Sequence, residues 1–475
     1  MATPLSSDHS GAWGDKGVPN DIGSILSKLE QNIEVLNLSE NEALNIDKDL
    51  CQIFTQLKSF IVQSCDSSLL FTQRTLHLLC GYGFHKAPKT ASHIALRCVC
   101  NLLLLSEPTR QIFVDQNRAA QAVDKMRSDH LEDQLVTSRL LLLCTYGTDL
   151  DLDHLVESSD ICSIIHLNLT RYKSYIQPCG SFLSGLDQAA CEETLKLLCN
   201  LMAFLPHKTS LFDDCLAPLF DLLRSIAIPS PPLQPPISSL INCLVFFKFE
   251  RATQNPCYGA VFPVHKSNAN VDCLVKILTL AAQSYSSEDL DKYGSPLMQV
   301  LLRVAEISPP GPKARLKSLI LPSADDRKTV LGEGRSLSAI LLRAATSVVS
   351  SRLRHLIPSL FFELSDKDPQ RLVHNVGYGY ASGFLLSLGT QLPPNSLNDI
   401  ATEVTTKQGL ETNPVSGQIR EREPKIDIPE MTEEEKGREA ERLFVLFERL
   451  RATGVINVEN PVSIAAQNGR LEEIE

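Results

Sequence analysis

The sequence lacks any long, unbroken apolar run. Although 43% of the 475 residues are hydrophobic, no run reaches the ~18 to 20 positions that a membrane-spanning helix needs. The first ten residues, MATPLSSDHS, also lack the basic and then apolar order of a secretion signal. We therefore expect a soluble, cytoplasmic protein with no transmembrane segment.

The sequence also lacks the motifs of metal sites and of covalent catalysis. No C-x-x-C pair occurs among its 14 cysteines, and Cys98 and Cys100, two positions apart on a helix, face different directions and cannot share one zinc ion. There is no G-x-x-x-x-G-K-[ST] phosphate loop, no H-E-x-x-H and no G-x-S-x-G. We expect no catalytic residue, no metal and no cofactor. Six cysteines lie in Leu-rich segments, which predicts that they are small buried side chains and not parts of a disulfide scaffold. They are Cys80, Cys98, Cys100, Cys144, Cys199 and Cys243.

Positive charge is in deficit, with 45 Lys and Arg against 56 Asp and Glu and a net charge of −11. This balance argues against nucleic acid as a partner, because phosphate binding depends on clustered Lys and Arg. Residues 313–354 are the exception, with nine basic residues, Arg352 and Arg354 among them, against three acidic ones. A surface for an anionic partner and an ordinary solvated face both fit this stretch.

Leu-rich stretches with helical spacing are abundant between residues 21 and 389. In Leu195, Leu198, Cys199 and Met202, for example, apolar residues recur every three or four positions, which predicts an all-α fold. A related helix motif recurs around Asn101, Asn200 and Asn242, which indicates a unit of roughly 40 to 50 residues, with one unmarked unit between the first two. This period is typical of armadillo or HEAT repeats. We expect a helical-repeat solenoid over residues 21–389, preceded by a disordered N-terminus over residues 1–20.

Polar side chains recur every four residues along the last helix of several predicted units. They form one stripe on each helix while the flanking positions are apolar. A concave binding groove and a solvated helix face explain these stripes equally well. The stripes comprise His93, Arg97 and Asn101; Glu192, Lys196 and Asn200; Ser238 and Asn242; and His355, Ser359 and Glu363.

Two segments lack the repeat pattern and are predicted to form other structures. Residues 229–236, Pro-Ser-Pro-Pro-Leu-Gln-Pro-Pro, resemble a polyproline II ligand, but a stiff connection between two repeats is the favoured interpretation. Residues 390–430 are rich in Pro, Ser, Thr and Asn, which predicts a flexible linker.

A well-specified helix follows this linker, within residues 431–475. Thr432 and Glu435 form a capping box. Leu443, Phe444 and Phe447 lie on one side, so that side must pack on the solenoid or on a partner. Sequence patterning does not distinguish these two possibilities.

Three blocks resemble the C-terminal signature of the synembryn family (resistance to inhibitors of cholinesterase). They are Gly-Tyr-Gly-Tyr-Ala-Ser-Gly at residues 377–383, Asn-Pro-Val-Ser-Gly at residues 413–417 and Met-Thr-Glu-Glu at residues 431–434. The resemblance implies an armadillo/HEAT-like solenoid that acts as a guanine nucleotide exchange factor and folding chaperone for the α subunits (Gα) of heterotrimeric G proteins. Animal members carry an acidic, phosphorylated stretch in the linker, whereas residues 390–412 contain only three acidic residues: Asp399, Glu403 and Glu411.

The resemblance also implies how the parts would act. The groove would capture the C-terminal helix of GDP-bound Gα and stabilise the nucleotide-free state, while the tethered helix braces the loosened domain; the protein would be a monomer, recruited to the cell cortex through Gα. The alternatives are an armadillo-type adaptor without exchange activity and, more weakly, a nuclear-transport carrier. The residues expected to contact Gα are His93, Arg97, Asn101, Lys196, Asn200, Asn242, Arg352, Arg354, Glu363, Leu443, Phe444 and Phe447.

Overall fold

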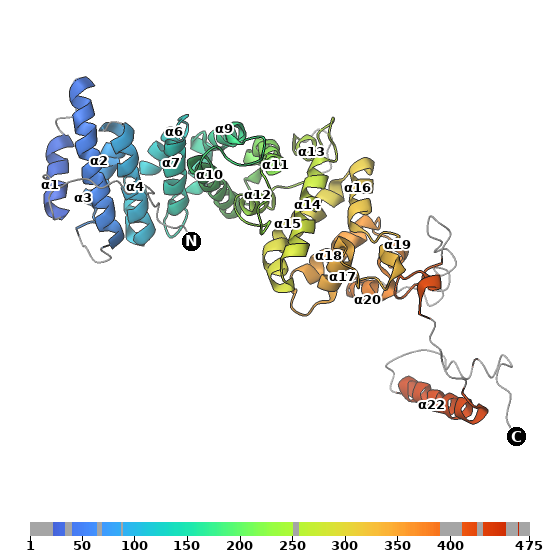
Figure 1. Ribbon diagram of the computed structural model, residues 1–475. Coiled ribbons are helices and arrows are strands. Elements are labelled where there is room, and N and C mark those ends of the chain that lie inside the picture. The colour runs from blue at the N-terminus through green and yellow to red at the C-terminus, as the bar shows by residue number, and fades with distance from the viewer. Residues whose placement is uncertain are drawn as a thin grey trace. The chain divides into compact units, whose positions relative to one another are not determined.

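The computed structural model describes residues 22–33, 40–63, 69–86, 89–249, 256–389, 411–424, 431–452 and 464. The predicted disordered N-terminus, residues 1–20, lies outside this part of the chain. The chain forms two compact units, residues 1–420 and residues 421–475. The described part of the first unit is built from helices, with two isolated bridges and no longer β-pairing, and the helices follow one another in chain order (Figure 1).

A central row of helices runs through the first unit, each packed on the next along the chain. Stacking of equivalent helices is what defines a solenoid, so the predicted all-α helical-repeat fold is confirmed. The central row consists of α2 (Glu40–Gln63), α4 (Lys89–Leu105), α7 (Leu131–Cys144), α10 (Gly185–Phe204), α12 (Ile237–Leu244), α15 (Ser287–Ile307) and α18 (Leu353–Leu364).

Shorter helices connect the members of this row and pack beside them. Before α7 they are α1 (Ile22–Ile33), α3 (Gln73–Gly81), η1 (Tyr82–Lys86), α5 (Glu107–Asp115) and α6 (Arg118–Met126). Up to α12 they are α8 (Leu152–Ser158), α9 (Ile161–Tyr172), η2 (Lys173–Tyr175), η3 (Thr209–Cys215) and α11 (Leu216–Ser225). The remainder are α13 (Pro256–Val261), α14 (Ala269–Ser284), α16 (Pro310–Ile320), η4 (Asp326–Lys328), α17 (Leu337–Thr346), α19 (Pro369–Val376) and α20 (Tyr378–Ser387).

In the middle of the row the repeat is at or slightly above the upper end of the predicted range of roughly 40 to 50 residues. The helices α7, α10, α12 and α15 begin at residues 131, 185, 237 and 287, which are 50 to 54 residues apart, because each unit holds two or three shorter helical segments and their loops in addition to the central helix. Helices α5 to α7 occupy the place of the predicted unmarked unit between Asn101 and Asn200.

Local side-chain caps fix where several central helices begin. Ser184 and Asp187 form a capping box at α10, in which the Ser184 hydroxyl accepts from the Asp187 nitrogen at 3.2 Å and the Asp187 carboxylate accepts from the Ser184 nitrogen at 2.7 Å. The start of α18 is capped from another helix. One carboxylate oxygen of Asp291 in α15 accepts from the backbone nitrogens of Arg352 at 3.0 Å and Leu353 at 2.8 Å, which links two members of the row directly.

Apolar side chains fill the space between the helices in two clusters that meet at α7. Five of the six cysteines in Leu-rich segments are buried as predicted, and burial raises the pKa of the Cys98 thiol to about 12. Cys199 is only half-buried. The Pro-rich segment 229–236 connects α11 to α12 and buries Leu233, whose backbone nitrogen donates to the Tyr285 hydroxyl at 3.2 Å, in agreement with a structural connection.

The prediction of a flexible linker over residues 390–430 is wrong for residues 411–420. This segment packs on the first unit, where its backbone pairs with residues near η4 and at the start of α20. Its Pro and Gly residues rule out a helix but suit a tight turn. Residues 390–410 and 425–430 lie outside the described part of the chain.

The second unit contains α22 (Glu433–Ala452). The predicted capping box is present, since the Thr432 nitrogen donates to the Glu435 carboxylate at 3.0 Å and the Glu435 nitrogen to the Thr432 hydroxyl at 3.4 Å. Among the described residues, no helix combines the length and apolar character that crossing a membrane would require.

Candidate functional site

A cavity of about 670 Å³ opens along the central row between α4 and α12. We call it the groove. Three residues of the predicted polar stripes, Lys196, Asn200 and Asn242, line this one cavity. The other lining residues are Leu104, Arg110, Leu142, Leu143, Tyr146, Leu195, Cys199 and Ser239.

The groove combines apolar side chains from α4, α7 and α10 with polar groups from α10 and α12. The Asn200 amide donates to the Thr145 hydroxyl at 2.9 Å, while Asn242 is exposed. The Lys196 ammonium lies 2.9 Å from a carboxylate oxygen of Glu193, yet 40% of its side chain stays exposed and accessible to a ligand. The described residues that line the groove include no acidic one. Such a surface suits a segment with apolar side chains and a negative group.

Arg110 fixes the loop at one edge of the groove. Its guanidinium donates from Nε to the Leu103 carbonyl at 2.7 Å and from Nη1 to the Tyr146 carbonyl at 3.2 Å. These bonds join the end of α4 to the loop after α7, where the Tyr146 side chain is half-exposed. The edge is therefore held in place before any partner arrives.

The first two members of the α4 stripe are engaged with α7. His93 Nε2 lies 2.8 Å from Asp133 Oδ1, and Arg97 Nε lies 2.5 Å from Glu132 Oε1. Burial alone would raise the pKa of Asp133, but hydrogen bonds from His93 and Ser128 and the charge of Lys125 lower its pKa to about 2. His93 and Arg97 therefore tie α4 to α7 and do not line the groove.

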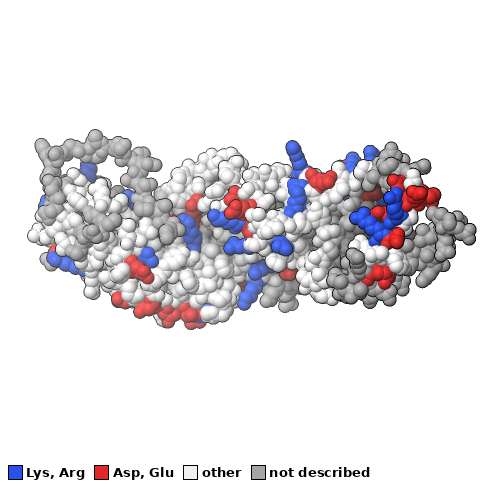
Figure 2. All heavy atoms as spheres, turned by 90° about the horizontal axis from the view of Figure 1, so that it is seen from below, with Lys and Arg blue, Asp and Glu red and all other residues white. Residues whose placement is uncertain are grey.

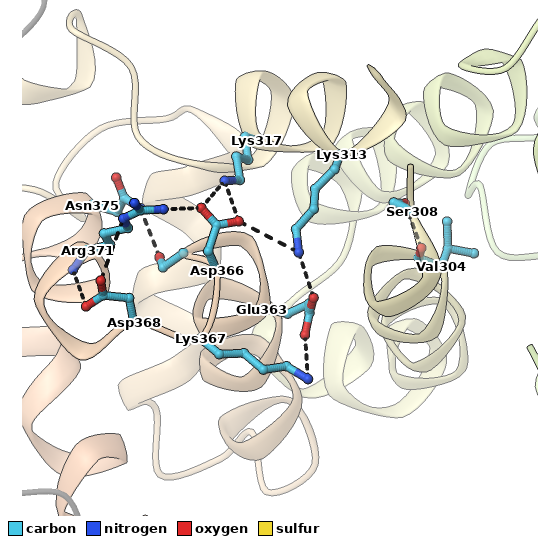
Figure 3. Close-up of polar contacts among 11 residues, drawn as sticks. Val304, Ser308, Lys313, Lys317, Glu363, Asp366, Lys367, Asp368, Arg371 and Asn375 are labelled. Carbon is cyan, nitrogen blue, oxygen red and sulfur yellow. Dashed lines mark hydrogen bonds and ion pairs between the residues drawn. The ribbon is translucent and has the colours of Figure 1, made fainter. Parts of the chain in front are cut away.

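Asn101 and Glu363 do not belong to an open polar stripe. Asn101 is 1% exposed and Glu363 is 5% exposed, because neighbouring helices cover the helix face on which each lies. The Glu363 carboxylate is bracketed by Lys313 Nζ at 2.8 Å and Lys367 Nζ at 3.2 Å (Figure 3). Helical spacing placed both residues on the correct helix, but its prediction that their side chains are exposed is wrong.

Most cations of the basic stretch 313–354 have partners within the fold. Lys313, Arg315, Lys317 and Lys328 form ion pairs with carboxylates, and basic side chains lie among acidic ones on the face shown in Figure 2. The side chains of Arg352 and Arg354, at the start of α18, are exposed and have no partner among the described residues. The potential positive surface is thus much smaller than the sequence count suggests.

The apolar residues of α22 are partly exposed within the second unit. Leu443 is 41% and Phe444 is 42% exposed, and Phe447 is half-buried. This helix thus exposes part of its apolar side to solvent.

The groove lies within the part of the chain that one family model matches. Residues 53–470 match the family described as "Guanine nucleotide exchange factor synembryn", a range that includes the central row from part of α2 to α18, residues 411–420 and α22. The chain belongs to the synembryn family. The resemblance drawn from its C-terminal blocks is confirmed.

Individual relatives are moderately similar to this synembryn-family chain. A synembryn-like chaperone of Schizosaccharomyces pombe is 33% identical over 189 residues, which are 38% of this chain and 35% of that protein. The chaperone Ric-8A of Macaca fascicularis is 27% identical over 194 residues, 39% of this chain and 36% of that protein. These two matches thus span about a third of each relative. The Ric-8A chaperone of Bos taurus is 27% identical over 466 residues, 91% of this chain and 84% of that protein.

Sequence reasoning missed most of the groove's apolar lining. Leu142 and Leu143 sit in a uniformly apolar stretch of α7, where nothing in the pattern separates the residues facing the groove from those facing the core. Tyr146, two residues beyond the end of α7, was detectable only by aligning the ends of successive central helices.

Proposed function

We propose that this synembryn-family chain is a guanine nucleotide exchange factor and folding chaperone for heterotrimeric G-protein α subunits. The observation that carries the proposal is the groove on the central row, which Lys196, Asn200 and Asn242 line together with apolar side chains. The groove binds the C-terminal helix of Gα, whose apolar side chains pack on Leu142, Leu143 and Leu195 and whose negative groups face Lys196.

Exchange of this kind needs no nucleophile. A factor that binds nucleotide-free Gα more tightly than GDP-bound Gα lowers the affinity of Gα for GDP by the same factor, because the two equilibria are linked. Each ten-fold preference corresponds to about 1.4 kcal/mol of differential binding. The protein's task is thus to make contacts that exist only with the open form.

The helix α22 supplies contacts that exist only with the open, nucleotide-free form of Gα. Its exposed Leu443 and Phe444, together with Phe447, pack on the loosened domain of Gα and cover apolar surface that the loss of GDP exposes. The chaperone activity follows from the same contacts, since a partly folded Gα exposes similar surface. The protein acts as a monomer in the cytoplasm and is recruited to the cell cortex through Gα.

The test is GDP release from purified, GDP-loaded Gα. We expect the full-length chain to accelerate release and, once GDP is removed, to form a stable complex with nucleotide-free Gα that excess GTP dissociates. Tight binding with an unchanged release rate would instead favour the second candidate, an armadillo-type adaptor, which the groove and its ligand-sized volume also suit.

A further inference from the structure

Residues 411–420 return to the first unit and bind it through their backbone. We call this segment the clasp. On one side it contacts the segment that contains η4, and on the other the start of α20. Four backbone hydrogen bonds join it to these elements: Ile419 N to Arg327 O at 2.8 Å, Leu331 N to Ser416 O at 3.2 Å, Tyr378 N to Pro414 O at 2.8 Å and Gly379 N to Val415 O at 3.1 Å.

The turn of the clasp is locally specified. The Asn413 side-chain oxygen accepts from the backbone nitrogens of Val415 at 2.9 Å and Ser416 at 3.3 Å, and the Gly417 nitrogen donates to the Asn413 carbonyl at 2.8 Å. Gly417 has a φ of +70°, and a Cβ added there would lie 2.3 Å from Leu331 Cδ1. A side chain at this position would be strained at the positive φ and would displace the buried side chain of Leu331, whose backbone nitrogen binds the clasp.

Arg327 connects the clasp to two other segments from inside the fold. Its guanidinium is almost completely buried, and burial lowers its pKa. Nη1 donates to the Gly417 carbonyl at 3.1 Å, and Nη2 donates to the carbonyls of His374 at 2.9 Å and Asn375 at 3.0 Å. The buried cation thus binds η4, α19 and the clasp together.

The clasp determines how many residues separate α22 from the last attached residue of the first unit. Glu433, the first residue of α22, lies 13 positions after Arg420 but 44 positions after Gly389, the last described residue beyond α20. At about 3.5 Å per extended residue, chain length limits Glu433 to about 45 Å from the end of the clasp. Without the clasp, the corresponding limit from Gly389 is about 150 Å.

We propose that Arg327 and Gly417 are positioning residues for α22, because the clasp they hold shortens the tether of this helix. The proposal rests on the proposed function, in which α22 must reach Gα while the groove holds it. For a tethered group, effective concentration falls roughly as chain length to the power −3/2. Lengthening the tether from 13 to 44 residues therefore lowers the effective concentration of α22 at its binding site about six-fold.

The test compares two ways of lengthening the tether. Gly417→Val releases the clasp, whereas an insertion of 31 Gly and Ser residues after Glu423 lengthens the tether and leaves the clasp intact. We expect each to slow GDP release from Gα about six-fold at a fixed, subsaturating concentration. Gly383→Val, which places the same side chain on α20 where a Cβ meets nothing within 4 Å, leaves the rate unchanged. An unchanged rate with either the insertion or Gly417→Val overturns the proposal.

A second measurement does not depend on Gα. Spin labels at Ser387→Cys and Glu441→Cys report the distance between α20 and α22. The labelled chain carries Ser in place of the cysteines that are not buried, which are the exposed Cys179, the half-buried Cys51, Cys162, Cys199 and Cys273, and Cys65, which lies outside the described residues. The distribution is expected to broaden and shift to longer distances in Gly417→Val and in the insertion variant. Identical distributions in all three proteins overturn the proposal even if the chain stimulates GDP release. A shifted distribution without GDP release by the unmodified chain overturns only the proposed function.

Discussion

Lys313 of α16 holds its ammonium nitrogen 2.8 Å from a carboxylate oxygen of Glu363 in α18. The Glu363 side chain is 6% exposed and its second cation, Lys367, is 65% exposed. We expect Lys313→Met to lower the free energy of unfolding by about 2 to 3 kcal/mol, since it leaves a buried carboxylate with only one largely solvated partner. Urea denaturation followed by circular dichroism measures the change.

The matched control is Lys328→Met, which removes the same charge from an exposed pair. Lys328 Nζ lies 2.7 Å from Asp325, whose side chain is 86% exposed, so we expect a change of less than about 1 kcal/mol. Equal effects of the two substitutions would show that the Lys313–Glu363 pair contributes no more than a surface pair.

The low pKa of Asp133 predicts a defined loss of stability in acid. Its pKa is about 2 in the folded protein against about 3.9 in an unfolded chain. A carboxyl with a depressed folded pKa stabilises the fold above its unfolded pKa, and the contribution is lost as pH falls toward the folded pKa. We expect Asp133 to contribute about 2 kcal/mol at pH 5 and progressively less between pH 4 and 2.

The Asp133→Asn variant isolates this contribution from the other carboxyls. Urea midpoints of the variant and the unmodified chain should differ most at pH 5 and should approach each other toward pH 3. If the difference between the two urea midpoints stayed constant over this pH range, the interactions of His93 and Lys125 with Asp133 would not depend on the charge of its carboxylate.

Thiol reactivity should single out Cys179 among the described cysteines. Cys179 is exposed, and hydrogen bonds from Ser181 lower the pKa of its thiol. A hydrogen bond with Cys243 also lowers the pKa of Cys199, but Cys199 is half-buried. Burial raises the pKa of Cys80, Cys98 and Cys144 to about 12. With substoichiometric iodoacetamide at pH 8, peptide mass spectrometry should find Cys179 modified first. Faster modification of a buried thiol in the native protein would contradict this burial pattern.

Removing α22 should slow exchange more than it weakens binding. A chain ending at Glu430 keeps the groove, so we expect it to bind Gα. With this chain, GDP should leave Gα at least about ten-fold more slowly than with the full chain, because burying even one large apolar side chain contributes about 1.5 kcal/mol. Leu443→Asp with Phe447→Asp should reproduce the loss. Arg438→Asp with Arg442→Asp, at the same spacing on the polar side, should not. Full exchange activity in the truncated chain would exclude a bracing role for α22.

The periodic features of this protein could be predicted from its sequence. Helical spacing of Leu and recurrence of the marker asparagines depend on each helix alone, so they identified the solenoid and placed Lys196, Asn200 and Asn242 on stripes that meet in the groove. The capping box at Thr432 is equally local, since its partner lies three residues away.

Features that depend on distant partners could not be predicted in the same way. Asn101 and Glu363 share the stripe pattern but are covered by neighbouring helices, and periodicity does not reveal which helix covers which face. Residues 411–420 have the composition of a linker, but backbone hydrogen bonds to distant segments and a buried arginine 90 residues away from Gly417 hold them. Local composition indicates whether a segment can form a helix, not whether it finds a binding surface.

The most direct test of the account is charge reversal inside the groove, measured as the rate of GDP release from Gα. Lys196→Glu places a negative charge on the groove lining, whereas Lys276→Glu makes the same change at an exposed position of α14 that does not line it. We predict that Lys196→Glu slows GDP release and weakens Gα binding at least about ten-fold, equivalent to about 1.4 kcal/mol, and that Lys276→Glu changes neither. Equal rates for Lys196→Glu, Lys276→Glu and the unmodified chain would contradict the assignment of the groove as the Gα-binding site.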